Sequence, residues 1–230
     1  MVKEIIRAEN LTKNYKLGES IVHALRGVSL SINAGEFLSI IGPSGSGKTT
    51  LLNLLGALDL PTSGKVFLDG VDLTQVPERK LYEVRRNKIG FVFQHFYLIP
   101  TLTTLENVLV PVIPIKNNSR FKDRAKELFS LVGLEERMNH KPNQLSGGEQ
   151  QRVAICRALI NNPEVLFCDE ITGELDSATG EKIVSLLKEI NQKEGVTIVF
   201  VTHDPMVSSK SNRIITLIDG KITSDKTVKF

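Results

Sequence analysis

The chain is poor in cysteine, has no long apolar run and carries no block of like charge, and each absence excludes a class of protein. Only two of its 230 residues are cysteines, Cys156 and Cys168. Both lie among apolar neighbours, so we interpret them as small buried hydrophobic residues rather than as a disulfide or a metal site. No apolar stretch approaches the ~18 to 20 residues of a membrane-spanning helix. Charged residues interrupt the first ten positions, where a signal peptide needs an apolar region, so we expect the chain to stay in the cytoplasm.

Charge is nearly balanced along the sequence. The 29 basic and 26 acidic residues give a net charge of +3, without the basic cluster that would follow a nucleic-acid backbone. Nucleic acid is therefore not expected as a partner. With 41% hydrophobic and 24% charged residues, the composition is that of a globular protein, and we expect one domain over residues 1–230.

The distribution of apolar residues predicts an α/β fold. Short β-branched runs recur at Val28–Ile32, Phe37–Ile41, Lys65–Leu68, Lys88–Phe93, Val165–Cys168, Thr197–Val201 and Ile214–Ile218. The runs between helical segments are mostly apolar throughout, which is typical of a parallel sheet buried on both faces. Residues 3–38 show only strand-like pieces, broken by Asn14, Gly18, Gly27 and the turn at 33–35, which predicts an antiparallel sheet at the start. Residues from about 95 to 150 predict a helical subdomain, and 150–160 and 179–190 predict further helices.

A glycine-rich turn follows the apolar run Phe37–Ile41. Its residues include Gly42, Ser44, Gly45, Ser46, Gly47, Lys48, Thr49 and Thr50. Glycine permits backbone angles closed to other residues, so successive N–H groups can converge on phosphate oxygens at the positive end of a helix. Lys48 adds a full positive charge. The spacing Gly-x-x-x-x-Gly-Lys-Thr between a strand and a helix therefore predicts a phosphate-binding loop.

Two carboxylates end the apolar run Val165–Cys168. Such a pair is often only a solvated strand end, but a phosphate-binding loop in the same chain favours a functional role. At the carboxyl end of a parallel strand, Asp169 would point into the ligand crevice and hold Mg²⁺ together with Thr49. Glu170, the next residue, would face the water that attacks the terminal phosphate.

A second helix start is suited to an anion. Ser146, Gly147, Gly148 and Glu149 lie within the run Leu145–Arg152, at the beginning of a predicted helix. A serine and two glycines at a helix start usually form only a cap. Because the glycine-rich turn already provides one helix start suited to phosphate, the ligand of this second one stays open.

Together these motifs resemble those of the ATP-binding cassette ATPases, the nucleotide-binding subunits of ABC transporters, over nearly the whole chain. In the family's order, the matching segments are Tyr15, Gly42–Thr50 (Walker A), Gln94 (Q-loop), Leu145–Arg152 (signature), Val165–Glu170 (Walker B), Leu175–Asp176 (D-loop) and His203. The resemblance implies that Tyr15 stacks on adenine, that Gln94 senses magnesium or water, and that His203 contacts the terminal phosphate and orients Glu170. Flanking residues are similar to the subfamily of LolD-type lipoprotein-release, MacB-type macrolide-efflux and FtsE-type cell-division ATPases.

The resemblance also implies partners and cofactors. Family members are P-loop NTPases that bind ATP and Mg²⁺ and form head-to-tail dimers. In such a dimer, the signature of one subunit covers the ATP on the P-loop of the other, so a second copy of this chain would be the partner of the second helix start. A separate transmembrane permease would hold the chain on the inner face of the cell membrane.

Two alternative functions stay open, and the sequence departs from the family pattern at two residues. An FtsE-like subunit would work a membrane partner without moving a substrate, and a soluble cassette would act on ribosomes or DNA. After Glu170 the family usually has proline, but this chain has Ile171, and Glu174 adds a charge near the predicted dimer seam. We expect Glu174 to weaken closure of the ATP-bound dimer through its proximity to Asp176 and the phosphates.

Overall fold

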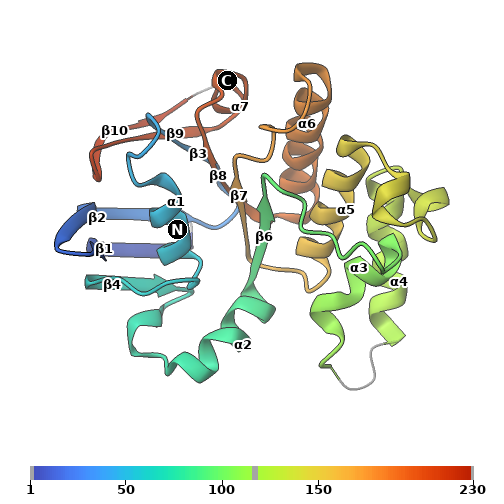
Figure 1. The fold of residues 1–230 in the computed structure, drawn as a ribbon, viewed down its shortest axis with the longest axis horizontal. Helices are drawn as coiled ribbons and strands as arrows, with labels where there is room; N and C mark the ends of the chain where they lie inside the picture. Colours follow the sequence, from blue (N-terminus) through green and yellow to red (C-terminus); the bar gives the residue numbers. More distant parts are fainter. Residues whose placement is uncertain (1–2, 116–118, 229–230) are drawn as a thin grey trace.

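The computed structural model describes residues 3–115 and 119–228 (Figure 1). The strands are β1 (Glu4–Leu17), β2 (Ser20–Asn33), β3 (Phe37–Ile41), β4 (Ser63–Leu68), β5 (Val71–Asp72), β6 (Ile89–Phe93), β7 (Val165–Asp169), β8 (Thr197–Thr202), β9 (Arg213–Ile218) and β10 (Lys221–Thr227). The α-helices are α1 (Lys48–Leu55), α2 (Glu78–Lys88), α3 (Thr104–Leu109), α4 (Ser119–Leu131), α5 (Gly147–Leu159), α6 (Ser177–Glu194) and α7 (Pro205–Ser209). Short 3₁₀ helices are η1 (Leu73–Gln75), η2 (Val110–Val112), η3 (Glu135–Arg137) and η4 (Pro142–Gln144).

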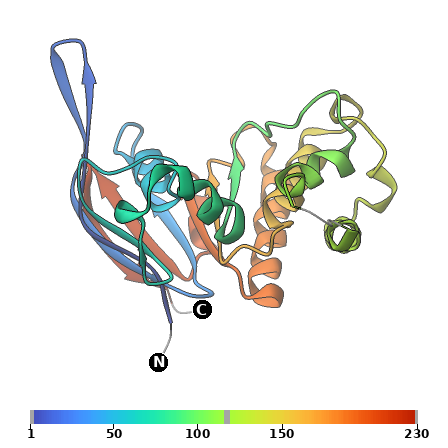
Figure 2. The same cartoon turned by 90° about the horizontal axis from the view of Figure 1, so that it is seen from below.

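An antiparallel sheet opens the chain, as the sequence predicts. Its order is β2-β1-β4-β5, and the β1–β2 hairpin projects from the body of the molecule (Figure 2). The hairpin turns at Gly18, whose positive φ of 60° suits glycine. Asn14 and Gly27 do not break the strands as predicted, because β1 and β2 absorb the irregularities as register shifts within continuous 14-residue strands.

The main sheet has the order β10-β9-β3-β8-β7-β6. Strands β9, β3, β8, β7 and β6 run parallel, and β10 pairs antiparallel at the edge. All six residues of β8 are buried, which explains why its four central residues are all apolar. The predicted α/β fold with a mainly parallel core is therefore confirmed. Strand β10 and helix α2 were not predicted, because both are polar: three of the seven β10 residues, and seven of the eleven in α2, are charged.

All regular elements described between β6 and β7 are helical. The apolar positions Phe121, Ala125, Leu128, Phe129 and Val132 are at most 6% exposed, so the helical spacing in the sequence marks the buried face of α4. They join α5, α6 and one face of the main sheet in a continuous core. A second core lies between the main sheet, α1 and the antiparallel sheet. The main sheet is thus packed on both faces, which fixes the positions of its strand ends.

Two sequence-based expectations concern the cysteines and membrane-spanning helices. Cys156 and Cys168 are both buried and free, which confirms their interpretation as packing residues, and burial raises the pKa of each thiol. Within residues 3–115 and 119–228, no helix combines the length and apolar character needed to cross a membrane.

Candidate nucleotide-binding site

The turn between β3 and α1 accommodates only glycine at two positions. A Cβ on Gly42 would lie 2.0 Å from the carbonyl oxygen of Leu217 and 2.8 Å from the hydroxyl of Ser46. A Cβ on Gly47, whose φ is 99°, would lie 2.4 Å from the carbonyl oxygen of Ala24. Gly47 is also the N-cap of α1 and provides no side-chain hydrogen bond. The first N–H groups of α1 are therefore left for an external acceptor.

Two side chains in this turn fit an anion. Lys48 is only 6% exposed, and its Nζ donates to the carbonyl oxygens of Gly42 and Pro43 at 2.9 and 3.0 Å. The buried hydroxyl of Ser46 has no hydrogen-bond partner among the described residues. A buried donor without a partner is costly, and a phosphate oxygen would satisfy it. Ser44, Gly45 and Thr50, also predicted to bind phosphate, belong to the same turn and the first turn of α1.

The predicted magnesium ligands meet at the carboxyl end of β7. The hydroxyl of Thr49 donates to Oδ1 of Asp169 at 3.3 Å. Burial raises the pKa of the Asp169 carboxyl, and the charge of Glu170 adds to this, while Thr49 and Lys48 oppose it. The described residues contain no cluster of three His, Cys, Asp or Glu side chains around a metal position. A cation here would need hydroxyl, carboxylate and phosphate oxygens together, which is the donor set that Mg²⁺ prefers.

Glu170 leaves β7 in a left-handed conformation. Its φ is 47°, which is uncommon for a residue other than glycine, and its N–H donates to the carbonyl of Val201 at 2.9 Å. Its carboxylate Oε1 lies 3.3 Å from Nδ1 of His203. The structure therefore brings the predicted water-binding carboxylate to the predicted histidine. A cavity of about 250 Å³ adjoins them, lined by Glu170, Thr172, Gly173, Thr202, His203, Asp204 and Pro205.

The segment after β6 contacts the segment after β7. Nε2 of Gln94 lies 3.0 Å from the position that a Cβ on Gly173 would occupy. Nδ1 of the next residue, His95, lies 2.5 Å from Oε1 of Glu174, so the two form an ion pair whenever the imidazole is protonated. Gln94 is thus held beside the residues that follow Glu170. Glu174 points toward His95, a partner that the sequence does not indicate.

The predicted signature begins α5. Ser146 is the N-cap: its Oγ accepts from the Glu149 N–H, while the Glu149 carboxylate accepts from the N–H and Oγ of Ser146, both at 2.8 Å. A Cβ on Gly148 would lie 2.5 Å from the methyl group of Thr179, so glycine allows α5 and α6 to approach closely. Gly147 precedes it in the first turn. In both ribbon views α5 lies on the opposite side of β7 and β6 from α1, so the chain does not bring its signature to its own Lys48 (Figures 1 and 2).

Tyr15 lies on the β1–β2 hairpin, beside the turn between β3 and α1. It pairs with Val22 of β2, and the same strand continues to Ala24, which contacts Gly47. Tyr15 is 37% exposed, and its hydroxyl donates to Asp59 at 3.1 Å.

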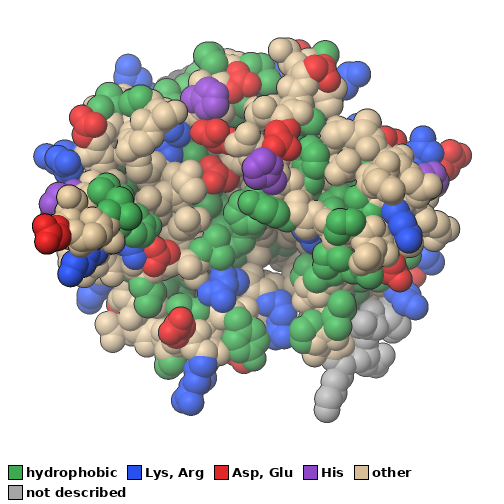
Figure 3. All heavy atoms as spheres, in the orientation of Figure 1, with side chains coloured by type: hydrophobic (Ala, Val, Ile, Leu, Met, Phe, Trp, Pro, Cys, Tyr) green, Lys and Arg blue, Asp and Glu red, His purple; other side chains and the backbone are tan. Residues whose placement is uncertain are grey.

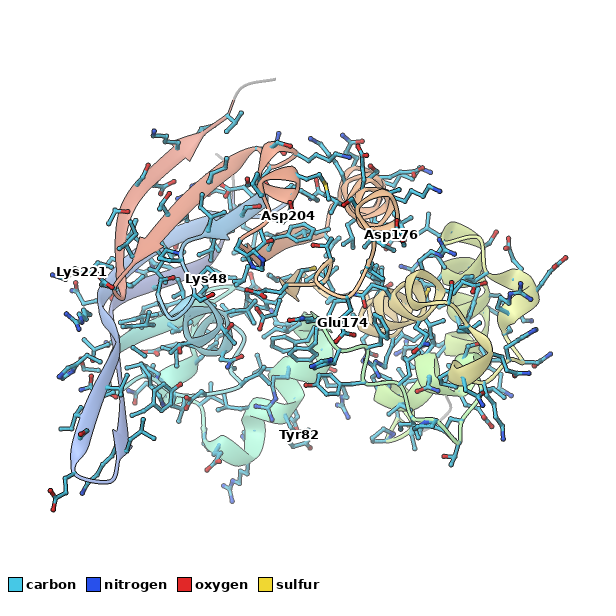
Figure 4. All side chains as sticks on the ribbon, turned by 45° about the horizontal axis from the view of Figure 1, so that its top comes forward. Lys48, Tyr82, Glu174, Asp176, Asp204 and Lys221 are labelled. Atoms are coloured by element: carbon cyan, nitrogen blue, oxygen red, sulfur yellow. The ribbon has the colours of Figure 1, made fainter. Side chains whose placement is uncertain are left out.

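Sequence reasoning missed three residues at the site. His95 follows Gln94 and Asp59 contacts Tyr15, but no local motif marks either one. Asp204 is the N-cap of α7, where it accepts from the Met206 N–H at 2.8 Å. An aspartate before proline at the end of a strand is a helix-start signal that could have identified it. Figure 4 shows Lys48, Asp204 and Glu174 around the same end of the main sheet. Lys48 begins α1, Asp204 precedes α7, and Glu174 precedes α6.

A groove of about 460 Å³ separates α2 and β6 from the helical part. It is lined by Leu58, Arg85, Arg86, Ile89, Gly90, Phe91, Phe93, Val110, Pro111, Pro114, Arg157, Ala158 and Asn161. Figure 3 shows this face hollowed between the two parts, with basic side chains nearby. The groove has an apolar floor and three arginines, and β6 connects it directly to Gln94.

Comparison with known proteins identifies the family. Residues 25–173 match the family described as ABC transporter. The chain is 51% identical to the ABC transporter ATP-binding protein MJ0796 of Methanocaldococcus jannaschii, over 98% of each chain. A solved structure described as a dimeric, post-hydrolysis state of the MJ0796 cassette bound to ADP and Pi has a TM-score of 0.89 and 49% identity, covering 98% of this chain and 100% of that one.

Two further relatives are named for transport systems. The lipoprotein-releasing system ATP-binding protein LolD of Aquifex aeolicus is 49% identical over 97% of this chain and 98% of that protein. The macrolide export ATP-binding/permease protein MacB of Syntrophobacter fumaroxidans is 47% identical over 95% of this chain, which spans only 31% of that protein. This chain therefore belongs to the ABC transporter family, as one of its ATP-hydrolysing cassettes.

Proposed function

We propose that this chain is the ATP-driven motor subunit of an ABC transporter, and that it drives a separate membrane permease through ATP-dependent head-to-tail dimerisation. The proposal rests on one observation. The starts of α1 and α5 are both suited to a phosphate, but they lie too far apart within one chain to bind the same one. A second copy turned end to end would bring each signature to the other's P-loop. The dimeric state and the ADP and Pi in the solved MJ0796 structures support this arrangement.

The P-loop edge of the sheet would hold the nucleotide. The proposed contacts are Tyr15, Gly42, Ser44, Gly45, Ser46, Gly47, Lys48, Thr49, Thr50, Gln94 and His203 in one copy, with Ser146, Gly147, Gly148 and Glu149 from the other. Tyr15 would stack on the base, and Lys48 and the α1 N–H groups would bind the phosphates. Thr49, Asp169 and Gln94 would hold Mg²⁺, which when bound offsets the charge of the phosphates.

Glu170 and His203 would act on the attacking water. The left-handed backbone turns Glu170 away from the path of β7, and the cavity beside it has room for a water and a terminal phosphate. The Glu170 carboxylate would accept the water's proton, and His203 would orient that carboxylate and contact the phosphate. Lys48 and Gln94 would keep the phosphate and the water in line.

The terminal phosphate would join the two copies. Charge-assisted hydrogen bonds contribute about 1.5 to 3 kcal/mol each, so several of them across one phosphate could drive association. Loss of that phosphate after hydrolysis would remove the bridge and allow the copies to separate.

The groove between α2 and the helical part would receive a cytoplasmic segment of the permease. Its floor is apolar, and β6 joins it to Gln94, so a change at the nucleotide could move the docked segment. The names of the relatives LolD and MacB favour export, or extraction of a lipoprotein, macrolide or peptide. The chain would then work on the cytoplasmic side of the membrane, held there by the permease.

Substitution of Glu170 by Gln tests this function. It should preserve ATP binding and trap an ATP-bound dimer, while the turnover falls by about 10²- to 10⁴-fold, the usual contribution of a general base. Light scattering with ATP and a phosphate-release assay measure the two effects. Glu189→Gln, on the exposed face of α6, is the matched control and should change neither. Unchanged hydrolysis in Glu170→Gln would exclude Glu170 as the base, and monomers with saturating ATP would exclude the dimer motor.

Transport and regulation differ in what stimulates hydrolysis. In a complex reconstituted with the permease, stimulation that needs an added substrate would support transport. Stimulation by the membrane partner alone would support the FtsE-like alternative.

A further inference from the structure

Lys13 and Tyr15, near the turn end of the β1–β2 hairpin, form a bonded group with Asp59. Tyr15 donates its hydroxyl hydrogen to Oδ2 of Asp59 at 3.1 Å, and Lys13 donates from Nζ to Oδ1 of the same carboxylate at 2.7 Å. Lys13 also donates to the carbonyl oxygen of Leu60 at 2.7 Å. Its ammonium group lies 5.1 Å from the centre of the Tyr15 ring. The ring is therefore held at two points, at its hydroxyl and by a cation near its face.

The group is partly shielded from water. The Lys13 side chain is 13% exposed and that of Asp59 is 35% exposed. Burial by itself would raise the pKa of the Asp59 carboxyl, but hydrogen bonds from Lys13, the Leu60 N–H and Tyr15 lower it. Asp59 is therefore ionised at neutral pH and keeps both bonds.

The same group ties two separate segments together. Asp59 lies in the loop between α1 and β4, whereas Lys13 and Tyr15 are two residues apart on one face of β1. Tyr15 is the cross-strand partner of Val22, so both side chains lie on the same face of the hairpin, and Val22 is 45% exposed. Two residues further along β2, Ala24 contacts Gly47 of the P-loop. An apolar surface with a fixed aromatic ring thus adjoins the phosphate-binding turn.

We propose that Asp59 and Lys13 are positioning residues for the nucleotide base: they fix the Tyr15 ring so that a flat aromatic base can stack on its exposed surface. This inference rests on the proposed function, in which Tyr15 contacts the base of ATP. A ring that is ordered before binding does not lose its conformational freedom when the base arrives, so the affinity for the base increases. The phosphates are bound by other residues and gain nothing from this group.

The test compares two ligands that share phosphates but differ in the base. Affinities for Mg-ATP and for magnesium tripolyphosphate are measured by calorimetry on the full chain. Asp59→Ala should weaken ATP binding about three- to tenfold, the effect of one or two lost hydrogen bonds, and leave tripolyphosphate binding unchanged. In a Tyr15→Ala background, Asp59→Ala should cause no further loss, because no ring remains to be positioned.

Controls separate positioning from support of the fold. Asp72→Ala also removes hydrogen bonds at a turn, those to Thr74, and should leave both affinities unchanged. If Asp59→Ala does not fold, two other variants should show the same selective loss: Tyr15→Phe, which removes the hydroxyl bond to Asp59, and Lys13→Met, which removes the ammonium group from Asp59, Leu60 and the Tyr15 ring. Equal losses for both ligands, no loss, or a further loss in the Tyr15→Ala background would each overturn the proposal. A native chain that binds neither ligand would instead contradict the proposed function.

Discussion

The starts of α1 and α5 are both suited to a phosphate, but only one of them is open. α1 begins at Gly47, without a side-chain cap, and Lys48 donates hydrogen bonds to the carbonyl oxygens of Gly42 and Pro43. α5 begins with Ser146 and Glu149 bonded to each other, and Arg137 pairs with Glu149 at 3.1 Å. The capping hydrogen bonds lower the pKa of Glu149, so a negative charge lies at the start of α5.

This difference matches the two roles proposed for the two sites. An open helix start can bind phosphate in a single chain. At the start of α5, side chains of the helix itself already fill these hydrogen-bonding positions. An incoming phosphate must therefore compete with Glu149 for the Ser146 hydroxyl. The signature should therefore bind only a phosphate that another surface already holds. Nucleotide binding would come first and dimerisation second.

The largest effect should come from breaking the two sites one at a time. Lys48→Ala removes the charge at the open site and should weaken ATP binding by a single chain at least about 100-fold, because a buried phosphate contact is lost. Ser146→Ala should leave that binding unchanged and abolish the ATP-bound dimer in a Glu170→Gln background. Calorimetry and light scattering measure the two properties.

The chain offers a matched control for Ser146→Ala. Thr103 and Glu106 form the same reciprocal cap at the start of α3. Thr103→Ala therefore loses a comparable cap, at about 0.5 to 2 kcal/mol, without touching the signature. If Thr103→Ala also prevented dimerisation, the loss in Ser146→Ala would reflect stability rather than phosphate contact.

A second large effect is expected at Asp169. Mg²⁺ should increase the affinity for ATP, and Asp169→Asn should reduce this increase at least about tenfold, because a charged ligand is lost. Without nucleotide the substitution should raise the melting temperature, because burial disfavours the ionised carboxyl and the asparagine amide carries no charge. Calorimetry with and without Mg²⁺ and thermal melts measure these effects.

The stabilisation by Asp169→Asn should depend on pH with a defined sign. Because the folded-state pKa of Asp169 is raised, its ionised form costs stability above that pKa, and the cost disappears as the pH falls and the carboxyl becomes protonated. The melting difference between native and variant chains should therefore shrink on acidification. A difference that grows toward low pH would contradict the burial of this charge.

Residues close in sequence account for what could be predicted of the fold and the site. The apolar run of β7 followed by two carboxylates predicted the strand end, and Thr49 does meet Asp169 there. The pairs Lys13–Asp59 and His95–Glu174 join residues 46 and 79 positions apart. Such pairs are set by how loops pack on the finished sheets, and no local pattern encodes them. The left-handed backbone of Glu170 is likewise a result of packing rather than of local propensity.

A smaller effect should follow from removing the charge at the closed site. Glu149→Gln keeps an acceptor for Ser146 but lowers the repulsion of a partner's phosphate, so the ATP-bound dimer should be about two- to fivefold more stable, as charges at helix starts usually contribute. Sedimentation of the Glu170→Gln background at several concentrations measures it. Glu106→Gln at the equivalent position of α3 should change nothing. A weaker dimer in Glu149→Gln would show that Glu149 assists the phosphate contact.

The smallest effect is expected at Glu174, because His95 lies beside its carboxylate. Glu174 lies 2.5 Å from Nδ1 of His95, and exposed pairs of this kind contribute about 0 to 1 kcal/mol when the imidazole is protonated. Because a protonated His95 offsets the charge of Glu174, Glu174→Ala should strengthen the ATP-bound dimer by no more than about twofold. In a His95→Gln background the charge is uncovered, so the same substitution should give the larger gain. Glu181→Ala on α6 serves as the control. Equal gains in both backgrounds would show that His95 does not shield Glu174, and no gain in either would remove Glu174 from the factors that limit closure.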